Sequence, residues 1–163
     1  GRGSCFTVTL PWAEEQAAIR KHEESGSVAS ASFPALSAQT SPALQILLVD
    51  DNLDAQWLLQ EYLQFQGFQV LVANNGLDAL HLATSHLPAI ILMDVQLPGM
   101  DGLETIRQLR SHESTATIPI IALTALAMRG DRDRCLAAGA TDYLSKPMNL
   151  QQLLDKVRHL ISN

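Results

Sequence analysis

Five short apolar runs recur along residues 44–163, and almost no polar residue interrupts them. Continuous runs of this kind are typical of strands that are buried on both faces, as in a parallel sheet. The five predicted strands cover residues 46–49, 70–72, 90–93, 118–123 and 143–144.

Segments with helical periodicity separate these runs. Apolar residues recur at i, i+3 or i+4, and i+7 after the first run and again at the end of the chain. They are Ala55, Leu58, Leu59, Tyr62 and Leu63 in the first segment and Leu150, Leu153, Leu154, Val157, Leu160 and Ile161 in the second. Gly67 stands where the first helix would stop, and Trp57 in that helix is predicted to be partly buried.

Weaker helix candidates cover residues 76–84, 103–111 and 128–138. Five strands that alternate with five helices predict an α/β fold: a doubly wound (βα)5 domain with a parallel five-stranded sheet. In such a fold the functional site lies at the carboxyl ends of the strands.

Composition divides the chain into three parts, of which residues 44–163 carry nearly all the structural signal. Residues 22–43 are rich in Ser, Ala and Pro and have almost no bulky apolar side chains. Such a stretch cannot bury enough surface to offset its ordering entropy, so it is predicted to be a flexible linker. Residues 1–21 combine a short apolar alternation with a charged tail.

The chain has 163 residues, of which 47% are hydrophobic, and a formal net charge of −6. This charge argues against nucleic acid or an anionic membrane as the partner, because both call for a basic face. No run approaches the ~18 apolar residues of a membrane span, and no signal peptide is recognised at the start. We therefore expect a soluble, cytoplasmic protein without direct membrane contact.

Cysteine and histidine give no sign of a metal site. Cys5 and Cys135 are too few for a disulfide framework and lack ligand spacing, so both are predicted to be reduced thiols. The histidines show no zinc spacing and are expected on solvated faces. They are His22, His81, His86, His112 and His159.

Charged and hydroxyl side chains follow four of the five predicted strands, and a parallel sheet brings them to one edge. They are Asp50, Asp51, Asp94, Thr124 and Lys146. Three carboxylates in one crevice repel each other by roughly 4 kcal/mol per pair at ~4 Å and an effective dielectric near 20. A divalent cation relieves this repulsion, and ligands that are all oxygens favour Mg²⁺ over Zn²⁺.

The remaining groups at this edge suit an oxyanion. The Lys146 ammonium and the Thr124 hydroxyl can both donate to a phosphoryl group. A site with Mg²⁺, a carboxylate nucleophile, a cation and a hydroxyl is equipped for phosphoryl transfer to an aspartate.

Four segments within residues 44–163 resemble the receiver domain of two-component response regulators, in the order and spacing of that family. Each segment alone is a weak signal, but the four together are highly specific. They are Leu48–Asn52, Met93–Gly102, Leu123–Ala125 and Asp142–Pro147. The resemblance implies a flavodoxin-like, CheY-like receiver fold over residues 44–163.

The resemblance also implies a phosphoacceptor and a metal site. Asp94 would accept a phosphoryl group from a phosphohistidine. Asp51 and Asp94 would ligate Mg²⁺ through their carboxylates, Val95 through its backbone carbonyl, and Asp50 directly or through water.

Lys146 would pair with the phosphoryl oxygens, and the Lys146–Pro147 peptide would be cis, an isomer that X–Pro bonds adopt at small cost. The phosphodonor would be the phosphoacceptor domain of a histidine kinase or a histidine phosphotransfer protein. The chain alone would be a phosphoacceptor that assists its own phosphotransfer and dephosphorylation.

A switch is implied by the same resemblance. Thr124 would turn toward the phosphoryl group, and Tyr143 would move inward to fill the vacated space, which changes the surface seen by partners. Ala125 is small, which leaves access to the phosphoacceptor. Gln96 and Leu126 would line the approach of water and so influence the phosphoryl lifetime.

The first residues carry a weaker resemblance. Gly1–Pro11 is similar to the last glycine box and closing strand of a histidine-kinase ATP-binding domain. This implies that residues 1–21 are a remnant of that domain and that the chain is the C-terminal piece of a hybrid sensor histidine kinase. The piece alone is expected neither to bind ATP well nor to phosphorylate itself.

Other functions remain as alternatives. A receiver that regulates or scaffolds a kinase without phosphorylation would not need the acidic site and Lys146. An aspartyl-phosphate phosphatase typically needs a second Asp two residues after its nucleophile, where Gln96 stands. In a flavodoxin-like carrier, Asp50 and Asp51 would repel the cofactor phosphate.

Two further expectations concern assembly. Because the chain ends at Asn163, directly after the fifth predicted helix, we expect no DNA-binding effector domain. The family allows a homodimer through the fourth and fifth helices, which the sequence leaves open.

Overall fold

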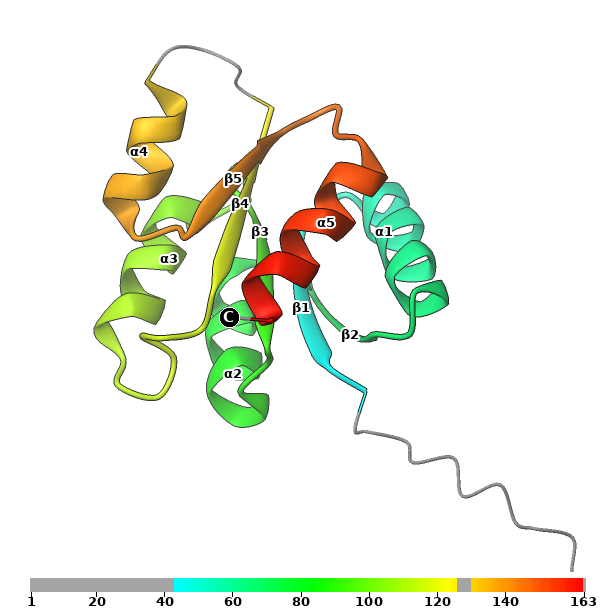
Figure 1. Ribbon diagram of the computed structural model, residues 1–163. Coiled ribbons are helices and arrows are strands. Elements are labelled where there is room, and N and C mark those ends of the chain that lie inside the picture. Colours follow the sequence, from blue (N-terminus) through cyan, green and yellow to red (C-terminus); the bar gives the residue numbers. More distant parts are fainter. Residues whose placement is uncertain (1–42, 126–129, 163) are drawn as a thin grey trace, which may run out of the picture. The chain divides into compact units, whose positions relative to one another are not determined.

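The structure is a computed structural model that describes residues 43–125 and 130–162. Within these ranges, five strands alternate with five helices, and the strands form one parallel sheet (Figure 1). The strands are β1 (Gln45–Val49), β2 (Gln69–Ala73), β3 (Ile90–Asp94), β4 (Ile120–Thr124) and β5 (Asp142–Ser145). The helices are α1 (Leu53–Phe65), α2 (Gly76–His86), α3 (Gly102–Ser111), α4 (Asp131–Ala138) and α5 (Leu150–Ile161). The predicted doubly wound (βα)5 fold is confirmed.

The strand order is β2-β1-β3-β4-β5. Helices α1 and α5 cover one face of the sheet, and α2, α3 and α4 cover the other (Figure 1). From β1 the chain moves to one side to form β2 and then returns to the other side for β3. This reversal places a topological switch point between β1 and β3, where ligands of such folds bind.

Neighbouring residues of β1 pack on opposite faces of the sheet. Ile46 and Leu48 belong to the core under α1 and α5, whereas Leu47 and Val49 belong to the core under α2, α3 and α4. All four side chains are fully buried. A strand that is covered on both faces needs apolar residues at every position, which explains the continuous apolar runs.

Helix ends follow local side-chain chemistry. Asn52 begins α1, because its Oδ1 accepts a hydrogen bond from the Ala55 N–H at 3.0 Å. The helix ends just before Gly67, which has a φ of 91° and turns the chain toward β2. Asn149 begins α5 in the same way, and its Oδ1 accepts from the Gln151 N–H at 2.8 Å.

The fourth strand begins later than the predicted residue 118. The Ile118 N–H donates to the Thr115 carbonyl at 3.1 Å, within the loop after α3. Pro119 has no N–H to donate, although its carbonyl accepts from Ile91. The ladder with β3 therefore starts at Ile120, which pairs with Ile91.

Trp57 is 67% exposed, so the predicted partial burial is wrong. The buried residues of α1 are Gln56, Leu59 and Leu63. At about 100° per residue, Trp57 and the half-exposed Leu58 point away from that face. The apolar periodicity of α1 thus contains residues from both sides of the helix.

Several predictions fall outside the described residues: the remnant at 1–21, nearly all of the linker at 22–43, Leu126, and the start of the fourth predicted helix at 128. Cys5 and His22 lie there too. Within the described part, the other four histidines are exposed, as predicted. No described helix is both long and apolar enough to cross a membrane.

Among the described residues, Cys135 is a free, buried thiol on α4. Burial raises the pKa of this thiol, and the nearby Asp131 carboxylate raises it further. A thiol with a raised pKa forms little thiolate at neutral pH and is correspondingly unreactive.

Candidate functional site

Four strands deliver polar side chains to the same edge of the sheet. Asp50 directly follows β1, and β3 and β4 end at Asp94 and Thr124. Lys146 directly follows β5, and its backbone N–H donates to the Thr124 carbonyl at 2.7 Å. Because β1, β3, β4 and β5 are successive neighbours in the sheet, the predicted convergence is confirmed.

Lys146 binds two carboxylates at once. Its Nζ donates to Asp50 Oδ2 and to Asp94 Oδ2, both at 2.7 Å. Asp50 is fully buried and Asp94 is 5% exposed, so water screens these two ion pairs only weakly. The ammonium therefore bridges the ends of β1 and β3.

The second oxygen of each carboxylate accepts a backbone N–H from two residues further along the chain. Asp50 Oδ1 accepts from the Asn52 N–H and Asp94 Oδ1 from the Gln96 N–H, both at 2.9 Å. These local bonds fix the carboxylate planes, as in the turns that aspartate commonly forms. Both acidic groups are thus oriented from two sides before any ligand arrives.

Burial and hydrogen bonding act in opposite directions on Lys146. Burial lowers the pKa of the ammonium, but the hydrogen bonds and negative charges of Asp50 and Asp94 raise it more, so the net shift is upward from 10.5. The Lys146 side chain consequently stays protonated at neutral pH. The Lys146–Pro147 peptide is cis, as expected.

Asp51 completes an acidic trio with Asp50 and Asp94. One carboxylate oxygen from each lies within 4.8 Å of the others, and this is the one potential three-ligand group among the described His, Cys, Asp and Glu residues. Three carboxylates against the single charge of Lys146 leave two negative charges (3 − 1 = 2). This charge and the all-oxygen donor set fit a divalent cation such as Mg²⁺.

The Val95 carbonyl, an expected metal ligand, already has a partner. It accepts a hydrogen bond from the Gly102 N–H at 3.1 Å, at the start of α3. Metal ligation by this oxygen would have to use its second lone pair. The fit to a divalent cation therefore rests on the three carboxylates.

The remaining predicted residues surround the trio or lie further along the sheet. Thr124 is buried (1% exposed) on the strand next to Asp94, whereas Ala125 and Gln96 are exposed. Tyr143 is half-buried on β5, with the Arg132 guanidinium 6.0 Å from its ring centroid. This cation lies within the range of a cation–π contact.

Gly102 explains how closely α3 approaches the site. A Cβ at this position would lie 2.0 Å from the Asp94 carbonyl oxygen and 2.8 Å from Val95 Cα. Any side chain would collide with this backbone, so only glycine permits the turn from β3 into α3. The start of α3 is thereby packed directly on the backbone of Asp94.

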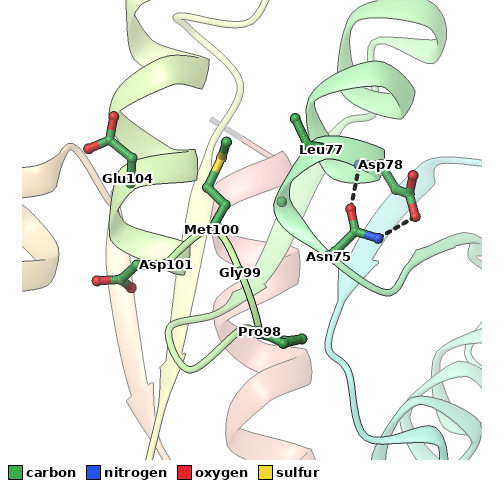
Figure 2. Close-up of a pocket in the computed structure, with 9 residues that line it drawn as sticks. Asn75, Leu77, Asp78, Pro98, Gly99, Met100, Asp101 and Glu104 are labelled. Carbon is green, nitrogen blue, oxygen red and sulfur yellow. Dashed lines mark hydrogen bonds between the residues drawn. The ribbon is translucent and has the colours of Figure 1, made fainter.

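A hollow of about 750 Å³ lies beside this turn, between the start of α2 and the β3–α3 loop (Figure 2). Leu77 and Met100 contribute apolar surface to it. Two of its carboxylates accept hydrogen bonds at the starts of α2 and α3: Asp78 accepts from Asn75 Nδ2 at 2.7 Å, and Asp101 accepts from the Leu103 N–H at 3.1 Å. This hollow could not be predicted from the sequence, because it depends on how the two loops pack.

Sequence reasoning also missed Gln56. This residue is 6% exposed and reaches from α1 to the loops after β1 and β2. The available signal was a polar residue on the helix face that otherwise carries Leu59 and Leu63, because such a residue needs internal hydrogen-bond partners.

Comparisons with known proteins agree with this geometry. The family model of the response regulator receiver domain matches residues 46–158. The polar-differentiation response regulator DivK of Brucella anthropi is 35% identical over 118 residues, which are 72% of this chain and 96% of DivK.

Solved structures give the same result. The receiver domain of the sensor histidine kinase PA1611 from Pseudomonas aeruginosa PAO1, solved with a magnesium ion in its active-site cleft, is 38% identical with a TM-score of 0.70. The alignment covers 74% of this chain and 99% of that domain. The chemotaxis response regulator CheY4 of Vibrio cholerae is 30% identical with a TM-score of 0.69, over 72% of this chain and 98% of CheY4. The chain therefore belongs to the family of response regulator receiver domains, the phosphoryl-accepting modules of two-component signalling.

Proposed function

We propose that Asp94 is the phosphoacceptor of this receiver and takes its phosphoryl group from a phosphohistidine. The observation that carries the proposal is the bridge from Lys146 Nζ to Asp50 and Asp94, both at 2.7 Å, beside the third carboxylate of Asp51. A lysine held between two carboxylates at a sheet edge can donate to phosphoryl oxygens when one carboxylate becomes an acyl phosphate.

The transfer is a displacement at phosphorus. A carboxylate oxygen of Asp94 forms a bond to phosphorus while the bond from phosphorus to the donor imidazole nitrogen breaks. The imidazole, which carries a proton on its other ring nitrogen, takes the electron pair of that bond and leaves as a neutral group, and Asp94 becomes an acyl phosphate. Lys146 then donates to the new phosphoryl oxygens and stabilises the charge that they carry.

Asp50, Asp51 and Asp94 are the residues that would hold Mg²⁺. When bound, the ion would neutralise charge on the transferring phosphoryl oxygens. Without it, the incoming dianion would meet two uncompensated negative charges. The magnesium in the cleft of the related Pseudomonas receiver supports this assignment.

Thr124 and Tyr143 are proposed to read the phosphorylated state. Thr124 lies at the end of the strand next to Asp94, where its hydroxyl can donate to a phosphoryl oxygen. Tyr143 is half-buried on β5 and is proposed to turn inward when Thr124 moves. Gln96 is exposed beside Asp94, and we propose that it and Leu126 influence how fast water hydrolyses the acyl phosphate.

The exposed face of α1 is proposed to contact the donor protein. Large apolar side chains are exposed there, outside the buried face of Gln56, Leu59 and Leu63. They are Leu53, Trp57, Leu58 and Phe65, with exposures of 71%, 67%, 51% and 86%. Several large apolar residues on the exposed face of one helix indicate a contact surface. This helix begins at Leu53, two residues after Asp51 of the acidic trio, so the face starts close to the site.

We also propose that the chain is part of a hybrid sensor histidine kinase, with residues 1–21 as a remnant of the ATP-binding domain. The resemblance of Gly1–Pro11 to the closing strand of such domains and the likeness to a sensor-kinase receiver support this context. A histidine phosphoacceptor domain or a histidine phosphotransfer protein would be the partner. Because the kinase uses ATP, we expect the exchange to take place in the cytoplasm.

Intact mass spectrometry after incubation with acetyl phosphate and Mg²⁺ tests the phosphoacceptor. The unaltered chain is expected to gain one phosphoryl group, whereas Asp94→Asn and a sample without Mg²⁺ are expected to gain none. Asp54→Asn is the matched control, because Asp54 is an exposed aspartate of α1 outside the trio. Equal labelling of Asp94→Asn and the unaltered chain would contradict the proposal.

A further inference from the structure

Gln56 holds the peptide that joins two residues of the acidic trio. Its side-chain Nε2 donates to the backbone carbonyl oxygen of Asp50. That carbonyl belongs to the planar peptide unit between Asp50 and Asp51, so fixing the oxygen also fixes the direction in which the chain enters Asp51. Asp50 is fully buried, whereas Asp51 is exposed.

The same amide group also reaches the loop after β2. Gln56 Nε2 donates to Asn74 Oδ1 at 2.7 Å, so the two hydrogens of the amide match two acceptors. The backbone N–H of Asp50 donates in turn to the Ala73 carbonyl at 3.2 Å. Both backbone groups of Asp50 are therefore tied to the end of β2, one directly and one through Gln56.

The position of Gln56 makes this link rigid. The residue lies in the first part of α1, on the face that packs against the sheet, and only 6% of it is exposed. A buried amide with satisfied donors has little freedom to rotate, because each alternative leaves an unpaired polar group.

We propose that Gln56 is a positioning residue for the divalent-cation site: it holds the Asp50–Asp51 peptide so that both carboxylates face Asp94. The inference rests on the proposed function, because it assumes that the trio binds Mg²⁺. Gln56 would not itself be a ligand of the cation, and it acts through the backbone of Asp50. Groups that orient metal ligands in this way commonly change metal affinity by a factor of 10 to 100 when they are removed.

The test is an NMR titration of the full chain with MgCl₂, in which amide shifts report the dissociation constant directly. Gln56→Met keeps the side-chain length and removes both donors. We expect its dissociation constant for Mg²⁺ to rise by about tenfold. Gln64→Met on the exposed side of the same helix is the matched control and should bind Mg²⁺ as the unaltered chain does.

Two further measurements separate positioning from a general loss of structure. At saturating Mg²⁺, the rate of labelling of Gln56→Met by acetyl phosphate should return to within about twofold of the unaltered rate, since the chemistry itself is intact. Asn74→Ala removes the Oδ1 that accepts from Gln56, at an exposed position, and should weaken Mg²⁺ binding by about threefold. This variant tests the positioning role if Gln56→Met fails to fold.

The outcomes are distinct. If the unaltered chain binds Mg²⁺ but Gln56→Met, or Asn74→Ala in its place, binds equally well, the positioning role is overturned and the proposed function stands. If the unaltered chain itself shows no shift with Mg²⁺, both are overturned.

Discussion

At the scale of single residues, the site depends on the Lys146 ammonium, which Asp50 and Asp94 share. Lys146 neutralises one of the charges that Asp50, Asp51 and Asp94 bring together, and a second cation is needed for the rest. The lysine is held by its own chain as well, through the hydrogen bond from its N–H to Thr124. Its charge is therefore fixed at the point where phosphoryl oxygens are expected.

Lys146→Met keeps the length of the side chain and removes its charge. We expect labelling by acetyl phosphate at saturating Mg²⁺ to slow by about a hundredfold, as when an enzyme loses one preorganised donor to a developing anion. Time-resolved intact mass measures this rate. Lys156→Met is the control, because it removes a lysine of α5 that forms an ion pair with Asp142 of β5. A similar loss of labelling rate in both variants would contradict the special role of Lys146.

The same variant tests the pKa of Lys146. Because the net shift is upward from 10.5, the folded protein holds this proton more tightly than the unfolded chain does. The stability that the ion pairs contribute is then fully present below about pH 10.5 and is lost as pH rises through the folded pKa.

Thermal unfolding without divalent cations measures this effect. The difference in melting temperature between the unaltered chain and Lys146→Met should be constant from about pH 7 to about pH 9 and should shrink at more alkaline pH. A difference that shrinks as pH falls would give the opposite sign and contradict the assignment.

The residues of the site differ in how far the sequence revealed them. The positions of Asp94 and Lys146 at one edge could be predicted because Asp94 ends the buried strand β3 and Lys146 directly follows β5, whereas their roles came from the resemblance to receiver domains. Gln56 could not be assigned a role, since its two acceptors belong to loops that only the folded sheet brings together. Trp57 was misjudged because apolar periodicity alone does not say which apolar residues of a helix face inward.

At the scale of elements, the turn from β3 into α3 is packed so closely that it cannot accommodate a side chain at Gly102. Gly102→Ala would place a Cβ 2.0 Å from the Asp94 carbonyl oxygen, so the start of α3 must move and Asp94 with it. We expect a loss of about 1–3 kcal/mol in the free energy of unfolding, together with slower labelling of Asp94.

Gly67→Ala is the matched control for this turn. Gly67 has a φ of 91° and open space around it, so alanine there is strained but far from the site. It should lower the free energy of unfolding by about 1 kcal/mol and leave labelling unchanged. Urea denaturation and intact mass give both quantities, and normal labelling of Gly102→Ala would show that α3 does not set the position of Asp94.

Trp57→Ala tests the proposed contact face of α1. Because Trp57 is exposed, the free energy of unfolding should change by less than about 0.5 kcal/mol. Transfer from a phosphorylated histidine phosphotransfer domain that labels the unaltered chain should slow by about tenfold, because exposed tryptophans often dominate protein interfaces. Labelling by acetyl phosphate should be unaffected.

Leu77→Ala controls for the loss of any exposed apolar side chain, since Leu77 is 66% exposed at the start of α2 on the other face of the sheet. If this variant slows transfer as much as Trp57→Ala does, the contact face does not lie on α1.

At the scale of the whole molecule, the strand order brings the residues of the site together. Asp50 and Asp94 lie 44 positions apart in the sequence (94 − 50 = 44), and Lys146 follows 52 positions later. The order β2-β1-β3-β4-β5 brings their strand ends to one edge. The alternation of apolar runs and helical segments was sufficient to predict this architecture, whereas the start of β4 depended on loop hydrogen bonds around Pro119 that no periodicity reports.

The central claim is that Asp94, rather than another carboxylate of the trio, carries the phosphoryl group. Borohydride reduces an acyl phosphate to the alcohol and thereby converts the phosphorylated aspartate into homoserine, which peptide mass spectrometry locates. After labelling with acetyl phosphate and Mg²⁺, we predict homoserine at position 94 alone. Homoserine at position 50 or 51, or a labelled chain without any homoserine, would contradict the account.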